Sequence, residues 1–145
     1  MAIKICHFVT RLDVGGMENG IINLSNRINT DKFIPYVYCL HTKGLMADRL
    51  IDDVRLINMG LKGGLFNSLL GVAPLIKQMK KDRIDIVHAH GWGQGSLIAL
   101  LASKLAGVPV VINGEHGGFF LKPAQKWFQY AISYFFDLTL SVSET

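Results

Sequence analysis

Two histidines end an apolar segment near the middle of the chain. Residues 84–88 form the apolar run, and His88 and His90 lead from it into Gly91 and Gly93. Such a run is typical of a buried strand, and parallel α/β sheets bind ligands outside the carboxyl ends of their strands. Imidazole can donate or accept a hydrogen bond near neutral pH, for example with a sugar hydroxyl or a phosphate. We therefore expect a ligand site where this strand ends.

The histidines allow two interpretations. Residues two apart in a strand share a face, so His88 and His90 could meet His116 from the next strand end. Three imidazoles with an open fourth position would resemble the zinc site of a metal hydrolase. We favour a core role for His88 and a crevice position for His90, because no second shell for a metal is evident. His7, in the middle of another apolar run, is expected to be structural. Analysis for bound zinc would separate the two interpretations.

Glycine-rich loops follow two other apolar segments. Gly15 and Gly16 could bring backbone N–H groups close to a phosphate at the start of a helix, although a tight turn explains them equally well. The dinucleotide-binding fingerprint fails because position 17 is methionine. Glu115 and His116 lie between glycines and could line the same crevice, and His116 is the stronger candidate of the two.

Apolar runs alternate along the chain with segments of helical spacing. The expected strands are residues 3–9, 33–40, 54–58, 84–88, 108–112 and 137–142. Five helices are expected between them: one that begins near residue 16, a short one near 45–51, one that ends near 81, and two that span 96–106 and 123–136. On the first helix, Ile21, Leu24 and Ile28 should lie on one side. This alternation predicts a Rossmann-like, doubly wound parallel sheet in a three-layer α/β/α domain. The polar strand ends should then meet at one edge.

Length and composition predict one globular domain over residues 1–145, half of it hydrophobic and 18% charged. The net charge of +4 is scattered, apart from a basic cluster that we interpret as a helix C-terminus, so no nucleic-acid partner is expected. This cluster comprises Lys77, Lys80, Lys81 and Arg83. Cys6 and Cys39 fall in apolar runs and are expected to be buried thiols. With no signal peptide evident at the N-terminus, a cytoplasmic location follows.

Residues 119–136 hold eight of the fourteen aromatic side chains. Core packing explains some of them, and an amphipathic helix at a membrane surface explains the mixture with lysine as well. The segment therefore predicts peripheral contact with the inner face of the cytoplasmic membrane. The contact residues would be Phe119, Phe120, Lys122, Lys126 and Trp127.

Six short motifs, taken together, resemble a known family. They occupy positions 5–8, 15–18, 85–90, 110–112, 115–117 and 141–143, and read ICHF, GGME, DIVHAH, VVI, EHG and SVS. In this order they look like the N-terminal domain of a family 4 glycosyltransferase (glycosyl transferases group 1) of the GT-B fold. The resemblance implies a retaining transferase that needs no metal or other cofactor. Such an enzyme moves a sugar from a nucleotide-sugar to a glycan or lipid-linked acceptor in cell-envelope polysaccharide synthesis.

By matching position, the resemblance also implies roles for individual residues. Gly15 and Gly16 would lie against the donor diphosphate and the acceptor, His90 would face the transferred sugar, and His116 would line the crevice. Glu18 would support the first helix. The family's C-terminal nucleotide-sugar domain, with its spaced pair of glutamates, is expected to be missing from this chain, which would be inactive alone. The alternative from another class is a non-catalytic doubly wound binding module.

Overall fold

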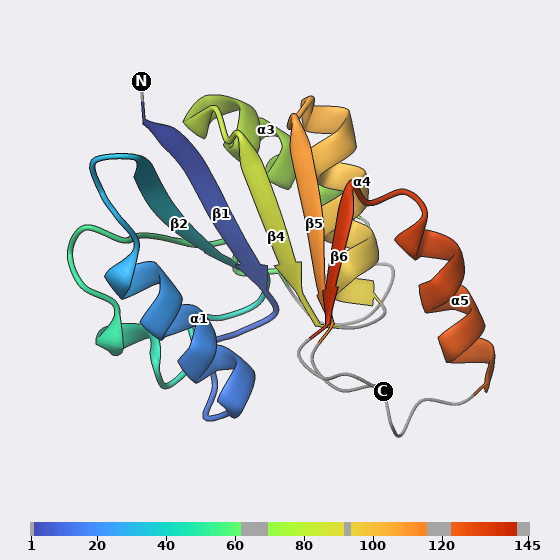
Figure 1. Cartoon of the computed structure of the whole chain (residues 1–145), viewed down its shortest axis with the longest axis horizontal. Coiled ribbons are helices and arrows are strands. Elements are labelled where there is room, and N and C mark those ends of the chain that lie inside the picture. Colours follow the sequence, from blue (N-terminus) through green and yellow to red (C-terminus); the bar gives the residue numbers. More distant parts are fainter. Residues whose placement is uncertain (1, 62–69, 92–93, 116–122, 142–145) are drawn as a thin grey trace.

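The computed structural model describes residues 2–61, 70–91, 94–115 and 123–141. Six strands form one parallel sheet in the order β3-β2-β1-β4-β5-β6, with helices along both faces (Figure 1). The elements are β1 (Ile3–Val9), α1 (Gly16–Arg27), β2 (Phe33–Cys39), the 3-10 turn η1 (Ala47–Arg49), β3 (Arg55–Asn58), α3 (Val72–Asp82), β4 (Ile86–His90), α4 (Gln94–Ala106), β5 (Val110–Glu115), α5 (Pro123–Ser133) and β6 (Leu138–Ser141). The predicted Rossmann-like fold is confirmed.

The chain changes direction across the sheet between β3 and β4. From β1 it adds β2 and then β3 on one side, and it then returns to place β4 against the other side of β1. The connections after β1 and β4 therefore run to opposite sides of the sheet, and the carboxyl ends of these two strands are where a doubly wound sheet is expected to form its ligand crevice. The expected ligand site lies at this switch point.

Two apolar clusters hold the sheet between its helices. One packs α1 and the region of η1 against β1 and β2, and the other packs α3 and α4 on the opposite face. Figure 1 shows α1 on one side of the sheet and α3 and α4 on the other. On α1, Leu24 is 49% exposed while Ile21, Ile22 and Ser25 are buried.

Two strands are longer at their carboxyl ends than the apolar runs predict. β4 begins at Ile86 and includes His90, and β5 continues through Gly114 to Glu115. Backbone hydrogen bonding with the neighbouring strand, rather than side-chain polarity, sets these ends: His90 is paired with Gly114. The residues expected in the crevice loops therefore lie on the sheet itself.

Smaller expectations are mostly met. Cys6 and Cys39 are free, buried thiols, and the basic cluster ends α3, where Arg83 adopts a left-handed conformation. The helix α4 is only partly buried, because its Leu101 and Leu105 are 38% and 62% exposed. Among the described residues, no helix combines the length and apolarity needed to cross a bilayer.

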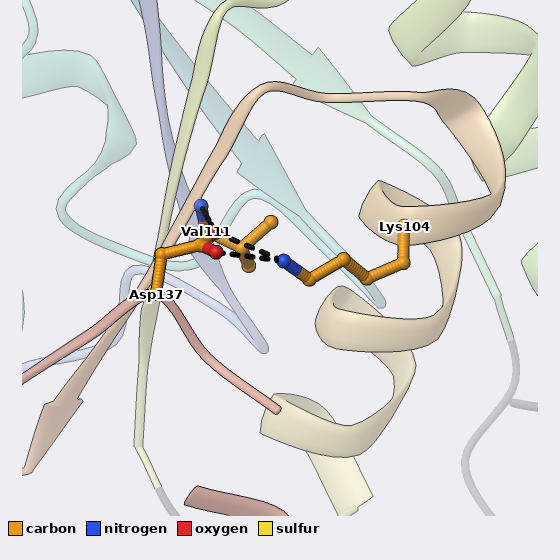
Figure 2. Close-up of polar contacts among 3 residues, drawn as sticks. All are labelled: Lys104, Val111 and Asp137. Carbon is orange, nitrogen blue, oxygen red and sulfur yellow. Dashed lines mark hydrogen bonds and ion pairs between the residues drawn. The ribbon is translucent and has the colours of Figure 1, made fainter. Parts of the chain in front are cut away.

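Asp137 joins α4 to the β5–β6 edge of the sheet (Figure 2). Its Oδ2 accepts the backbone N–H of Val111 at 2.7 Å, and both carboxylate oxygens lie within 3.0 Å of Lys104 Nζ. The Lys104 ammonium, and then the Val111 N–H, hold the pKa of Asp137 below its usual value. The contact fixes the start of β6 because Asp137 N–H also donates to Val111 O.

Asp137→Ala is expected to lower the free energy of unfolding by about 1 kcal/mol, because the Val111 N–H loses its acceptor. Asp137→Asn keeps an oxygen acceptor for Val111 but loses the ion pair with Lys104. Because that ion pair is largely exposed and screened by solvent, the expected loss in the free energy of unfolding is about 0.5 kcal/mol. Urea titration of both variants measures the difference. Equal losses would show that the charge, rather than the hydrogen bond to Val111, holds β6.

Candidate functional site

Three histidines from β1 and β4 meet on one face of the sheet. His7 is paired with His88 in the β1–β4 register, and His90 follows two residues later on the same face. His7 Nδ1 and His90 Nε2 are 3.0 Å apart and share a hydrogen bond. The rings of His88 and His90 are nearly stacked, with centroids 3.9 Å apart and planes at 36°. The strand pairing thus builds an imidazole cluster at the switch point.

The cluster is more buried than the sequence predicts. His7 has no exposed surface and His90 has 7%, while His88 is partly buried. The expectation that His90 stands open in the crevice is therefore wrong, and His88 is not simply part of the apolar core. Burial, followed by the nearby charge of His88, lowers the pKa of His7 to about 3. His7 is thus neutral at physiological pH.

The geometry of the cluster fits hydrogen bonding better than metal coordination. One ring nitrogen from each histidine lies within 4.8 Å of the others. Tetrahedral zinc, with Zn–N bonds of about 2.0–2.1 Å, needs nitrogen separations of roughly 3.4 Å, so the ligands would have to move together. His7 Nε2 is buried without a hydrogen-bond partner among the described residues, and His7 Nδ1 is held in a direct hydrogen bond with His90 Nε2. The trio considered from the sequence included His116, which lies outside the described residues.

Gly15 and Gly16 stand at the start of α1, as expected. Gly15 is the N-cap residue and its carbonyl accepts the N–H of Asn19 at 3.0 Å. The carboxylate of Glu18 folds back over the same turn, so that a Cβ on Gly15 would be 2.3 Å from Glu18 Oε2. A negative side chain is favourable at a helix N-terminus, which agrees with the expected supporting role of Glu18. It also means that any diphosphate at this turn must share the space with a carboxylate.

The loops after three strands are fixed by backbone contacts. Gly91 follows β4 with a φ of 108°, which favours glycine, and its carbonyl accepts a hydrogen bond from Ser96 Oγ at the start of α4. Gly44, with a φ of 80°, packs against the backbone of Leu12, and a Cβ there would be 2.3 Å from Leu12 atoms. This close approach ties the loop after β2 to the loop after β1.

Glu115 is farther from His90 than the sequence suggests. It is the last residue of β5 and is paired with Ser141 of β6, while Gly114 is the residue paired with His90. Because side chains alternate along a strand, Glu115 lies on the face opposite to His90. The structure thus brings His90 together with His88 and His7, and not with Glu115.

The sequence analysis missed the part that His7 plays. A histidine inside an apolar run reads as a structural residue, since nothing nearby in sequence marks it. Its contact with His90 joins residues 83 positions apart and depends on the β1–β4 register. One signal was available in the sequence. His7 and His88 are both histidines in apolar runs, and a doubly wound strand order makes those two strands neighbours.

The strand order, the glycine turn after β1 and the imidazoles at the switch point define an α/β Rossmann-like domain of the GT-B type. Residues 14–145 match the family described as Glycosyltransferase Family 4, so the chain belongs to that family. This confirms the resemblance inferred from the six motifs.

The chain is also similar in sequence to one curated enzyme and in structure to several solved proteins. It is 28% identical over 118 residues to UDP-Gal:alpha-D-GlcNAc-diphosphoundecaprenol alpha-1,3-galactosyltransferase of Escherichia coli, a match that covers 79% of this chain and 30% of that enzyme. A glycosyltransferase from Rickettsia africae has a TM-score of 0.74 at 19% identity, over 98% of this chain and 37% of that one. MurG of Acinetobacter baumannii has a TM-score of 0.71 at 15% identity, over 99% and 42%.

The same fold occurs in an enzyme with a different reaction. A UDP-GlcNAc 2-epimerase from Neisseria meningitidis, bound to UDP-GlcNAc, has a TM-score of 0.68 at 13% identity, over 96% of this chain and 40% of that one. The chain spans well under half the length of each of these four proteins.

Proposed function

We propose that this chain is the acceptor-side, N-terminal domain of a retaining glycosyltransferase. The enzyme would transfer a hexose from a nucleotide-sugar to a lipid-linked or glycan acceptor in cell-envelope polysaccharide synthesis. The observation that carries this proposal is the family match over residues 14–145, which includes β4 and the site residues expected from the sequence, Gly15, Gly16, His90, Glu115 and His116. The Escherichia coli relative, named as a transferase that uses UDP-Gal and a lipid diphosphate acceptor, supports the substrate classes.

His90 takes the central role in the proposed site. It ends β4 beside the glycine turn at Gly91, where a ligand in the crevice would first meet the sheet. A neutral imidazole there can donate a hydrogen bond to a hydroxyl of the transferred sugar. Such a contact positions the anomeric carbon and costs little to form, because strand pairing already holds the ring.

The first turn of α1 takes the diphosphate in this proposal. The N–H groups after Gly15 and the positive end of the helix would attract the phosphates. Glu18 would swing away or accept a hydroxyl of the acceptor, since two negative groups cannot occupy one turn. Glu115, the last residue of β5, and His116, which follows it, are assigned to substrate binding as well, with Glu115 on the face of the sheet opposite to His90.

The remaining parts of the enzyme would lie outside this chain. A C-terminal domain would bind the nucleotide and supply the acidic groups that act on the donor, so the 145 residues alone would not turn over substrate. No metal or other cofactor is assigned to the reaction, because the backbone N–H donors at the start of α1 can stabilise the charge on the leaving diphosphate in place of a cation.

The test is a transfer assay with the full-length protein. It would be incubated with UDP-galactose, UDP-glucose or UDP-N-acetylglucosamine, and with a GlcNAc-diphospho-lipid acceptor of short chain. We expect a labelled lipid product whose new bond keeps the α configuration of the donor, and unchanged rates in EDTA. The 145-residue chain alone serves as the control and should give no product.

Other results would point to the other classes. Formation of a C2 epimer from UDP-N-acetylglucosamine without transfer would favour the epimerase reaction of the structural neighbours. Binding of a nucleotide-sugar or glycan without any turnover would favour the binding module. Hydrolysis that stops when bound zinc is removed would favour the metal hydrolase.

We also propose that α5 rests on the inner face of the cytoplasmic membrane. Ile132 and Phe136 turn one side of this segment into the core. Trp127, Tyr130 and Tyr134 recur at helical spacing on the outer side, with exposures of 72%, 61% and 70%. Aromatic rings that stand beside lysine fit the boundary between headgroups and acyl chains. Lys126 and Trp127 belong to the contact predicted from the sequence, and its other residues, Phe119, Phe120 and Lys122, lie outside the described part.

Trp127→Ser is expected to weaken binding to vesicles of phosphatidylglycerol and phosphatidylcholine about tenfold, because burial of the indole ring is lost. Co-sedimentation with the vesicles at low salt measures the bound fraction of each protein. Binding should fall as added salt screens the lipid charge. The matched control is Leu45→Ser, which removes an equally exposed apolar side chain, 82% exposed, from the segment between β2 and β3. Equal effects of the two substitutions would rule out α5 as the contact.

A further inference from the structure

The hydrogen bond between His7 and His90 poses a question of proton placement. His7 Nδ1 and His90 Nε2 lie 3.0 Å apart, so one of these two nitrogens carries a proton and the other accepts it. Each neutral imidazole has one N–H and one bare nitrogen. The choice made at this bond therefore fixes the tautomer of both rings.

The surroundings of His7 decide the choice. Its other nitrogen, Nε2, is buried and has no hydrogen-bond partner among the described residues. If the proton were on Nε2, an N–H donor would be buried without an acceptor, which is rarer and more costly than an unpaired acceptor. The low pKa of His7 removes the doubly protonated form. His7 therefore keeps its proton on Nδ1 and donates it to His90 Nε2.

We propose that His7 is a positioning residue that fixes His90 in the Nδ1–H tautomer. The inferred proton placement rests on the β1–β4 geometry alone. Its role in catalysis rests on the function proposed above. With Nε2 occupied as an acceptor, His90 presents its Nδ1–H as the donor.

A second proton on His90 would also find no acceptor in His7. It would go to Nε2 and point at the N–H of His7, so His7 would have to move its own proton to the unpartnered Nε2 position. Glycosyl transfer develops positive charge on the sugar ring. A neutral donor can orient that sugar without repelling it, whereas an imidazolium would oppose the charge.

The tautomer can be read directly in the 145-residue chain. Long-range proton–nitrogen NMR spectra of histidine labelled with ¹⁵N distinguish protonated from bare ring nitrogens, and His90→Ala identifies the His90 signals by their loss. We expect a protonated Nδ1 and a bare Nε2 on His90 in the unmodified chain. A bare Nδ1 and a protonated Nε2 would overturn the proposal.

Two amide substitutions at position 7 form a matched pair. Asparagine places its amide where Nδ1 lies and can still donate to His90, whereas glutamine places its amide near Nε2 and cannot. His7→Gln should move His90 towards the Nε2–H tautomer, and His7→Asn should preserve Nδ1–H. In the full-length enzyme, His7→Gln should lower kcat by about tenfold or more with little change in KM, and His7→Asn should restore most of kcat.

The outcomes separate this inference from the proposed function. If the full-length protein transfers no sugar but the NMR results are as expected, the function fails and the positioning role of His7 stands. If transfer is observed and the two variants lose kcat equally, or neither loses any, the inference fails while the function stands. Should His7→Gln not fold, the tautomers of the unmodified chain and of His7→Asn decide the question.

Discussion

His90→Ala is expected to lower kcat of the full-length transferase by about 100-fold, while the domain keeps its fold. A preorganised hydrogen-bond donor at a reacting group is worth about this much in other enzymes, because it need not reorganise during the reaction. His90 ends β4 and is held there by pairing with Gly114 and by the His7 hydrogen bond. Steady-state rates with saturating donor and acceptor measure the loss.

His41→Ala is the matched control for this experiment. His41 also follows a strand of the same sheet, but it lies after β2, two strands from β4, and its Nδ1 is bound to the carbonyl of Leu61 at 2.8 Å. The same substitution there removes an imidazole and a hydrogen bond from a residue outside the cluster of His7, His88 and His90. A His90→Ala enzyme with the turnover of the unmodified protein would refute the role assigned to His90.

Acid is expected to destabilise the chain through His7. The pKa of His7 is about 3 in the folded protein and about 6.5 in an unfolded chain, so the unfolded state binds the proton first as pH falls. The stabilisation is complete above pH 6.5 and is lost progressively between pH 6.5 and 3. Between pH 7 and pH 4.5 this one group should remove about 3 kcal/mol from the free energy of unfolding.

The contribution of His7 can be isolated by comparison with His7→Gln. Glutamine does not titrate, so the difference in free energy of unfolding between the two proteins should shrink as pH falls from 7 to 4.5. Carboxylates titrate in both proteins and largely cancel in the difference. Denaturant titrations at three pH values give the result, and parallel curves for the two proteins would contradict the assigned pKa shift.

The fold follows from the sequence because buried parallel strands are continuous apolar runs. Each of the six predicted strands is found, and β1 has the predicted bounds. The errors have a common physical origin. β4 and β5 extend into polar or glycine residues because hydrogen bonds to neighbours, which no local pattern records, set the strand ends. Leu24 on α1 is exposed because tertiary packing selected the Ile22 and Ser25 side of the helix.

The candidate site could be predicted only in part. The sequence locates His90 and the glycine turn at Gly15, since both follow apolar runs. It cannot give the register between β1 and β4, and that register is what sets His7 beside His88 and within hydrogen-bond reach of His90. Nor can it give burial, which turns His90 from an expected open crevice residue into a nearly enclosed one.

The β1–β4 pair also separates two halves of the sheet. Each strand bonds only to its immediate neighbours, so β2 and β3 are joined to β4 only through β1. A change in the length or tilt of an outer strand can therefore leave the β1–β4 register unaltered, and with it the hydrogen bond between His7 and His90.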